Sequence, residues 1–146
     1  MGALTTSVGP GEDKNKAYSH VKNLIRGFYS TPPTYGQAIV SEILSDNSIK
    51  NLWVSELGTM RERIVKMRIL LSNLLEQCIP EKSFEQIRKQ NGMFSDLGLS
   101  AEDAYSLRND HGVYILESGR LCIAALNEGN IERVADAISK VLLKPN

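Results

Sequence analysis

Two arginines and one phenylalanine stand where neighbouring residues restrict the backbone. Arg26 is followed by two aromatic residues and then by two consecutive prolines, which stiffen the chain beyond the guanidinium. Phe94 lies in an expected strand entered through a glycine, and Arg120 opens an apolar strand directly after Gly119. A guanidinium is planar and always charged, so an arginine beside a restricted backbone is expected to present a cation in a fixed position. The plainer alternatives are an exposed helix-end arginine, a core phenylalanine and a solvated turn arginine.

Other catalytic chemistry has less support in the sequence. His20 and His111 stand among polar neighbours, without cysteine or carboxylate at metal-binding spacing, which predicts two surface histidines. No Gly-rich phosphate loop, nucleophile elbow or paired-cysteine motif occurs. Cys78 and Cys122 are too far apart for a disulfide framework or a zinc site, which favours a reducing compartment. These residues alone define no activity.

The composition limits the kinds of partner that the chain can bind. Its 146 residues suit one domain or part of a larger one, and 17 basic side chains balance 17 acidic ones. Zero net charge argues against a nucleic-acid partner, which needs a basic face. No apolar stretch approaches the roughly 20 residues of a membrane helix, and the first 16 residues lack a signal-peptide core. We therefore expect a folded cytoplasmic or organellar protein without nucleic acid or membrane.

The elements that position these residues begin with a strand already under way at residues 2–8, which suggests truncation. Helical periodicity then predicts helices over residues 17–28 and 35–44, because the double proline between them ends the first.

A long helix follows, and it is the strongest pattern in the sequence. Apolar residues spaced alternately by four and three form one stripe over three heptads: Trp53, Leu57, Met60, Ile64, Met67, Leu71 and Leu74. Pro80 ends this helix, which predicts a length of about 30 residues. The pattern is typical of a helix that crosses from one domain to another, and the alternative is a coiled-coil dimer.

The second half predicts an α+β arrangement of shorter elements. We expect a helix over 83–90, a strand over 92–97, a helix capped by Ser100, a hairpin of strands 113–116 and 121–125, and a final helix capped by Asn130. Gly119 supplies the positive φ of the hairpin turn. The buried face of the last helix is expected to comprise Ile131, Val134, Ala135, Ile138 and Leu142.

Four segments together resemble a known family. Residues 26–33, 90–94 and 118–120, followed by Asn130-Ile131, resemble in order and spacing the C-terminal portion of aspartate aminotransferases, class I enzymes of fold type I that depend on pyridoxal phosphate. The resemblance covers nearly the whole chain. It implies an α/β fold with an α+β C-terminal half: residues 1–46 end the large domain, 47–79 form the interdomain helix and 80–146 form most of the small domain.

The resemblance also implies roles for four residues. Arg120 is similar to the arginine that binds the substrate α-carboxylate, and Arg26 to the arginine that reaches across a homodimer to the distal carboxylate. Phe94 resembles an aromatic that lines the substrate pocket, and Ser30 lies in the segment that approaches the neighbouring subunit's cofactor phosphate. The sequence departs from the family pattern at two positions that shape the expected pocket. Ala125 replaces a common glycine, and Asp96 replaces a common aromatic.

The implied activity is amino transfer from L-aspartate to 2-oxoglutarate with pyridoxal 5'-phosphate, in the complete enzyme. None of the nine lysines here stands in an apolar setting suited to the Schiff base, so the family's catalytic lysine is expected upstream. The strand at Gly2-Ala3-Leu4 looks like the one that follows that lysine. An aromatic or broad-range aminotransferase is one alternative, and a catalytically dead interaction module that dimerises through the heptad helix is another.

Overall fold

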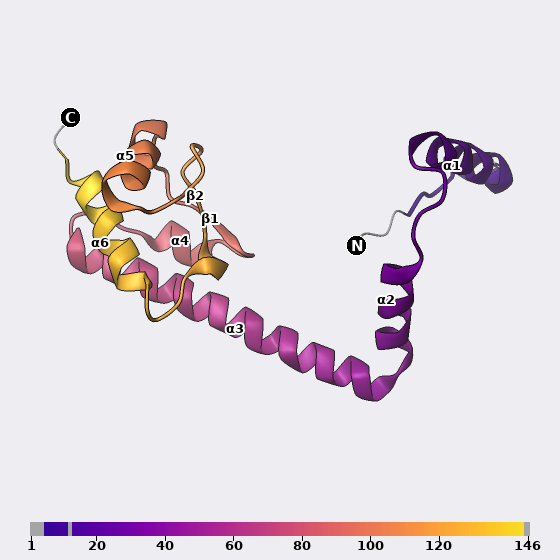
Figure 1. Cartoon of the computed structure of the whole chain (residues 1–146), viewed down its shortest axis with the longest axis horizontal. Coiled ribbons are helices and arrows are strands. Elements are labelled where there is room, and N and C mark those ends of the chain that lie inside the picture. Colours follow the sequence, from indigo (N-terminus) through magenta and orange to yellow (C-terminus); the bar gives the residue numbers. More distant parts are fainter. Residues whose placement is uncertain (1–4, 12, 145–146) are drawn as a thin grey trace. The chain divides into compact units, whose positions relative to one another are not determined.

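The computed structural model describes residues 5–11 and 13–144, and the chain forms two compact units, 1–55 and 56–146. Figure 1 shows the elements along the chain. The long helix α3 (Asn47–Cys78) gives its first residues to the first unit and the rest to the second. No described helix is both long and apolar enough to cross a membrane. The division into residues 1–46, 47–79 and 80–146 stays a prediction.

The described part of the first unit is helical. Helices α1 (Lys14–Phe28) and α2 (Tyr35–Ser45) confirm the two predicted helices. Helix α1 begins three residues earlier than predicted, because the side chain of Asp13 accepts a hydrogen bond from the Asn15 amide at 2.8 Å and caps the helix there. The predicted opening strand is wrong for residues 5–8, which form no strand, and its residues 2–4 lie outside the described chain. A strand needs a neighbouring strand for its backbone hydrogen bonds, and residues 5–8 have none among the described residues of this unit.

Helix α3 confirms the predicted long helix, with 32 residues. It begins after Asp46, whose Oδ1 accepts hydrogen bonds from the amides of Ser48 and Ile49 at 2.7 and 3.0 Å. Only the second half of the apolar stripe is buried. Met67 and Leu71 are buried, whereas the earlier stripe residues Trp53, Leu57 and Met60 are exposed.

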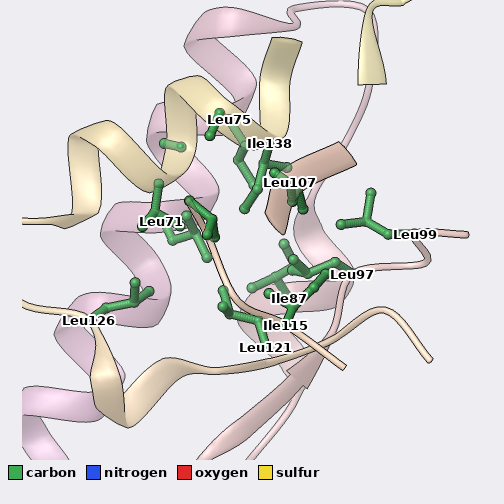
Figure 2. Packing of buried hydrophobic residues seen from close by; sticks show 14 of the residues in the cluster. Leu71, Leu75, Ile87, Leu97, Leu99, Leu107, Ile115, Leu121, Leu126 and Ile138 are labelled. Atoms are coloured by element: carbon green, nitrogen blue, oxygen red, sulfur yellow. The ribbon is translucent and has the colours of Figure 1, made fainter. Parts of the chain in front are cut away.

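The second unit packs around the second half of α3. Its other elements are α4 (Glu85–Lys89), β1 (Phe94–Asp96), α5 (Ala101–His111), β2 (Arg120–Cys122), the 3-10 helix η1 (Ile123–Ala125) and α6 (Ile131–Leu142). Figure 2 shows the core, where Leu71 and Leu75 of α3 join Leu107 of α5 and Ile138 of α6. All four are fully buried, and each such side chain contributes about 1.5–3 kcal/mol of hydrophobic free energy. The core therefore fixes α3 beneath the two short strands.

The predicted hairpin is wrong in its strand pairing. Residues 113–116 form no strand, and β2 pairs instead with β1, antiparallel, with Ser95 opposite Leu121. The apolar run that suggested a strand has another cause: Val113 and Ile115 are buried, whereas Tyr114 and Leu116 are exposed. Alternating burial reports which face meets the core, and an extended loop gives the same signal as a strand.

The turn before β2 agrees with expectation, whereas both strands are shorter than predicted. The turn before β2 does use Gly119, at φ 75°. The predicted strand over 92–97 is reduced to β1. The expected second strand ends at Cys122, where η1 begins, although the Ile123 amide still donates to the Met93 carbonyl, at 2.8 Å, in line with the β1–β2 register.

Two helix caps illustrate what a sequence pattern specifies. Ser100 caps α5 as predicted, in a reciprocal capping box with Asp103. Asn130 precedes α6, but its side chain makes no cap hydrogen bond; it accepts from the Asn127 amide at 2.8 Å and holds the preceding turn. On α6 the expected buried face is confirmed except for Leu142, which is half-buried.

Candidate functional site

The two-stranded sheet brings Phe94 and Arg120 to one face. The register places Asp96 opposite Arg120 and Phe94 opposite Cys122. Because side chains alternate along a strand, the central pair of Ser95 and Leu121 points the other way, and both are buried. The outer face of the sheet therefore carries two of the predicted substrate residues together.

Arg120 lies over the ring of Phe94. The guanidinium carbon is 4.6 Å from the ring centroid, a cation–π contact worth about 0.5–1 kcal/mol at an exposed site. Phe94 is 42% exposed, so it is not a core residue. Within residues 5–11 and 13–144, the N–H donors of Arg120 make no side-chain hydrogen bond or ion pair. The ring thus orients a cation whose hydrogen-bonding edge is available to an anion.

Asp96 faces Arg120 across the sheet but is turned toward the following loop. Its Oδ1 accepts a hydrogen bond from the Gly98 amide at 2.9 Å. Gln90 holds the Asp96 backbone on both sides: its Oε1 accepts from the Asp96 amide at 2.9 Å, and its Nε2 donates to the Asp96 carbonyl at 3.0 Å. No ion pair joins Asp96 to Arg120 among the described residues, so the carboxylate does not block the guanidinium.

Arg68 of α3 supports β1 from the buried side. Arg68 as a residue is 3% exposed, and its guanidinium donates to the carbonyls of Gly92 at 2.6 Å and Ile87 at 3.2 Å, and to the Ser95 hydroxyl. Burial lowers the pKa of Arg68, although an arginine in a protein remains protonated.

Arg63 supports the chain that follows β2. Its two terminal nitrogens donate to the carbonyls of Ala124 and Leu126, each at 2.8 Å. The two carbonyls lie on either side of Ala125, the residue that replaces a glycine common in the resembled family. The bonds therefore fix the backbone at this position whether its residue is alanine or glycine.

Neither supporting arginine was predicted from the sequence, because both stand outside the apolar stripe of α3. A signal was present for Arg68. Ile64, Arg68, Leu71 and Leu75 recur at spacings of four, three and four, which places Arg68 on the buried face. Arg63 had no comparable signal, because it is an exposed residue and its guanidinium bonds only to backbone carbonyls.

Arg26 and Ser30 lie in the first unit and are described within it. Both are exposed, and with Lys22 they line a depression of about 380 Å³ at the end of α1. The amides of Tyr29 and Ser30 both donate to the Ile25 carbonyl, at 3.1 and 3.2 Å. Ser30 has φ 61°, a conformation that costs a non-glycine residue about 1–2 kcal/mol. Their roles in substrate and cofactor binding stay predictions.

The remaining titratable residues limit the chemistry of this chain. All nine lysines are exposed, and none has the desolvated setting that a Schiff-base lysine requires, so the residues present do not fit that role. His20 is a surface residue as predicted. His111 is not: it is half-buried, and its Nε2 is enclosed without a hydrogen-bond partner in the described chain. The described residues contain no cluster that could hold a metal ion.

Comparison with known proteins defines the family. Residues 1–138 match the sequence model described as Aminotransferase class I and II, and the chain belongs to this family. It is 38% identical over 142 residues to the aromatic-amino-acid aminotransferase of Escherichia coli strain K12. It is 39% identical over 142 residues to the aspartate aminotransferase of the same strain. Each comparison covers 97% of this chain and 36% of the relative, so the chain spans about a third of the length of these curated relatives.

A solved structure shares the fold. The aromatic-amino-acid aminotransferase from Burkholderia pseudomallei, covalently bound to pyridoxal phosphate, superposes with a TM-score of 0.82 at 43% identity. The match covers 88% of this chain and 32% of that one. The fold is therefore that of part of a fold-type I aminotransferase, and the family resemblance seen in the sequence is confirmed.

Proposed function

We propose that this chain is the carboxylate-binding part of an aspartate-type aminotransferase, which transfers the amino group of L-aspartate to 2-oxoglutarate. The observation that carries the proposal is the Arg120 guanidinium, held over Phe94 with its donors unpaired among the described residues. The names of the matched relatives support the same reaction class.

Arg120 binds the α-carboxylate that every amino acid substrate carries. A guanidinium offers two parallel N–H donors that match the two oxygens of a carboxylate, which a lysine cannot do. The ring of Phe94 covers one face of the guanidinium and restricts its rotation, and it supplies an apolar wall beside the bound carboxylate. These two residues orient the substrate.

Arg26 and Ser30 serve the neighbouring subunit of a homodimer. Arg26 binds the distal carboxylate of aspartate or 2-oxoglutarate, and Ser30 approaches the cofactor phosphate. Their shared depression at the end of α1 supports this pairing of roles. The cofactor is pyridoxal 5'-phosphate, which supplies the electron sink for amino transfer when it is bound. Its lysine lies outside these 146 residues, because none of the lysines here fits.

An aromatic-amino-acid aminotransferase is the second candidate. The aromatic and aspartate relatives from Escherichia coli are nearly equally similar to this chain, at 38% and 39% identity. Both functions use the α-carboxylate site at Arg120. They differ in how strongly the distal carboxylate is required.

A chimeric enzyme tests the proposal. This chain replaces the matching stretch of the Escherichia coli aspartate aminotransferase, and amino transfer to 2-oxoglutarate is measured with aspartate and with phenylalanine. We expect turnover with a preference for aspartate, and preference for phenylalanine would favour the second candidate. The 146-residue chain alone, mixed with pyridoxal phosphate, is expected to form no stoichiometric adduct after borohydride reduction. A chimera that folds and binds cofactor but transfers no amino group would favour a catalytically dead module.

A further inference from the structure

We propose that Arg68 is a positioning residue for the substrate-carboxylate site: it fixes β1 so that the ring of Phe94 receives the guanidinium of Arg120. The inference rests on the proposed function for its consequence in binding, and on the structure alone for its geometry.

One guanidinium holds the backbone before and after Phe94. Arg68 donates to the Gly92 carbonyl at 2.6 Å and, more weakly, to the Phe94 carbonyl at 3.4 Å, and it also bonds to the hydroxyl of Ser95. A further bond to the Ile87 carbonyl, at 3.2 Å, ties the same guanidinium to α4. The segment that carries the ring is therefore anchored to α3 at three residues: Gly92, Phe94 and Ser95.

This anchor continues into β2 through the strand register. Ser95 forms the central pair of the sheet with Leu121, between the pairs that contain Phe94 and Arg120. Arg68 bonds to Ser95 from the buried side of the sheet. This bond fixes the Ser95–Leu121 pair and leaves the outer face, which carries Phe94 and Arg120, accessible. Arg63 fixes the chain beyond β2 from the same helix. Helix α3 thus sets where both substrate residues stand.

An arginine at this position is costly unless its hydrogen bonds are needed. Arg68 is 3% exposed, and no carboxylate pairs with it within the described chain. A buried charge without a counter-ion loses its hydration, whereas a methionine of similar length would fill the space without that loss. The planar fork reaches several carbonyls at once, and a lysine amine does not. The arginine therefore serves the geometry of this segment.

The geometric test uses the 146-residue chain and nuclear magnetic resonance. The aromatic ring of Phe94 shifts the resonances of the Arg120 δ-protons upfield, and this ring-current shift reports their contact without any substrate. The variants are Arg68→Met, Arg68→Lys and Ser95→Ala. The matched control is Arg61→Met, which removes a charge from an exposed position of the same helix.

We expect the ring-current shift to be unchanged in Arg61→Met, reduced in Ser95→Ala and lost in both Arg68 variants. A folded Arg68→Met chain that keeps the wild-type shift overturns the proposal. If the Arg68 variants do not fold, an unchanged shift in Ser95→Ala overturns it, because that variant removes only the hydroxyl acceptor.

The functional test uses the chimera described above. Misplacing a binding group weakens substrate binding more than the chemical step, so Arg68→Lys should raise KM for aspartate about tenfold and leave kcat nearly unchanged. Equal losses in Arg61→Met would contradict a specific role for Arg68. If the unsubstituted chimera is inactive, the proposed function fails, and the ring-current shifts still decide whether Arg68 positions Phe94.

Discussion

The guanidinium carbon of Arg120 lies 4.6 Å from the ring centroid of Phe94, across the antiparallel pair of β1 and β2. The two residues belong to different strands, so their contact depends on the strand register. A shift of the register by one residue would turn Arg120 to the opposite face. The contact is therefore a sensitive indicator of whether the site is intact.

Replacing Phe94 with leucine should weaken carboxylate binding modestly. The cation–π contact is lost while the strand and the arginine remain, so KM for aspartate in the chimera should rise about two- to fivefold. Phe94→Tyr keeps an aromatic face and is the control, with little change expected. Equal KM values for the leucine variant and the unsubstituted chimera would show that the ring does not orient Arg120.

Replacing Asp96 with asparagine should strengthen carboxylate binding. The substitution removes a negative charge opposite Arg120 and retains an oxygen that accepts from the Gly98 amide. For exposed charges we expect a gain of about two- to fivefold in affinity, measured as KM for aspartate at low salt. The gain should shrink at 1 M salt because of screening. A gain that does not depend on salt would point to a change of shape instead of charge.

Gly119 should tolerate substitution much less well than Gly98. Both have positive φ, but a Cβ on Gly119 would lie 2.6 Å from the Leu99 carbonyl oxygen, whereas one on Gly98 meets nothing within 4 Å. Gly119→Ala should lower the free energy of unfolding by about 2–4 kcal/mol, and Gly98→Ala by about 1 kcal/mol. Urea denaturation of the two variants measures the difference. Equal losses would mean that backbone conformation alone governs Gly119.

Acid should destabilise the second unit in part through Glu76. Hydrogen bonds from Arg88, at 2.8 Å, and from the Phe84 amide, at 3.0 Å, lower the pKa of this carboxyl. A carboxyl whose pKa is lower in the folded state stabilises the fold above its ordinary pKa, near 4.3, and this contribution is lost as the pH falls through the lowered value.

The melting temperature, measured between pH 7 and pH 3, tests this contribution of Glu76 to stability. Glu76→Gln should lower the melting temperature at pH 7 and show a weaker dependence on pH. Glu132→Gln, at an exposed position on α6, is the matched control. A wild-type pH dependence in Glu76→Gln would exclude this carboxyl as a contributor.

The sequence was sufficient for elements whose signal is local. The heptad spacing located α3, and Ser100 with Asp103 located the start of α5, because periodicity and capping depend on residues within a few positions. Strand pairing depends instead on residues that are far apart in the sequence. The apolar run that contains Val113 and Ile115 was typical of a strand, although its residues form a loop. The partner of β2 is β1, and the residues of their central pair, Ser95 and Leu121, are 26 positions apart.

The candidate site was likewise predicted only in part: its two substrate residues were identified, but their contact and its support were not. Arg120 and Phe94 were identified separately from the sequence, but their contact follows from the register, which no residue pattern specified. The buried Arg68 was overlooked because a charged residue on a helix is usually solvated. Its bonds are to backbone carbonyls and a hydroxyl, and such partners leave no recognisable pattern in a sequence.

The most direct test of the proposed function compares Arg120→Ala and Arg26→Ala in the chimera, with aspartate and phenylalanine as amino donors. Both substrates have an α-carboxylate, so Arg120→Ala should lower kcat/KM for both. Losing a charge-assisted pair costs about 3–5 kcal/mol, or a hundred- to several-thousand-fold. Arg26→Ala should lower kcat/KM for aspartate by a similar factor and leave phenylalanine nearly unchanged, because only aspartate has a distal carboxylate. An Arg120→Ala chimera that keeps its kcat/KM for both substrates would contradict the assignment of the carboxylate site.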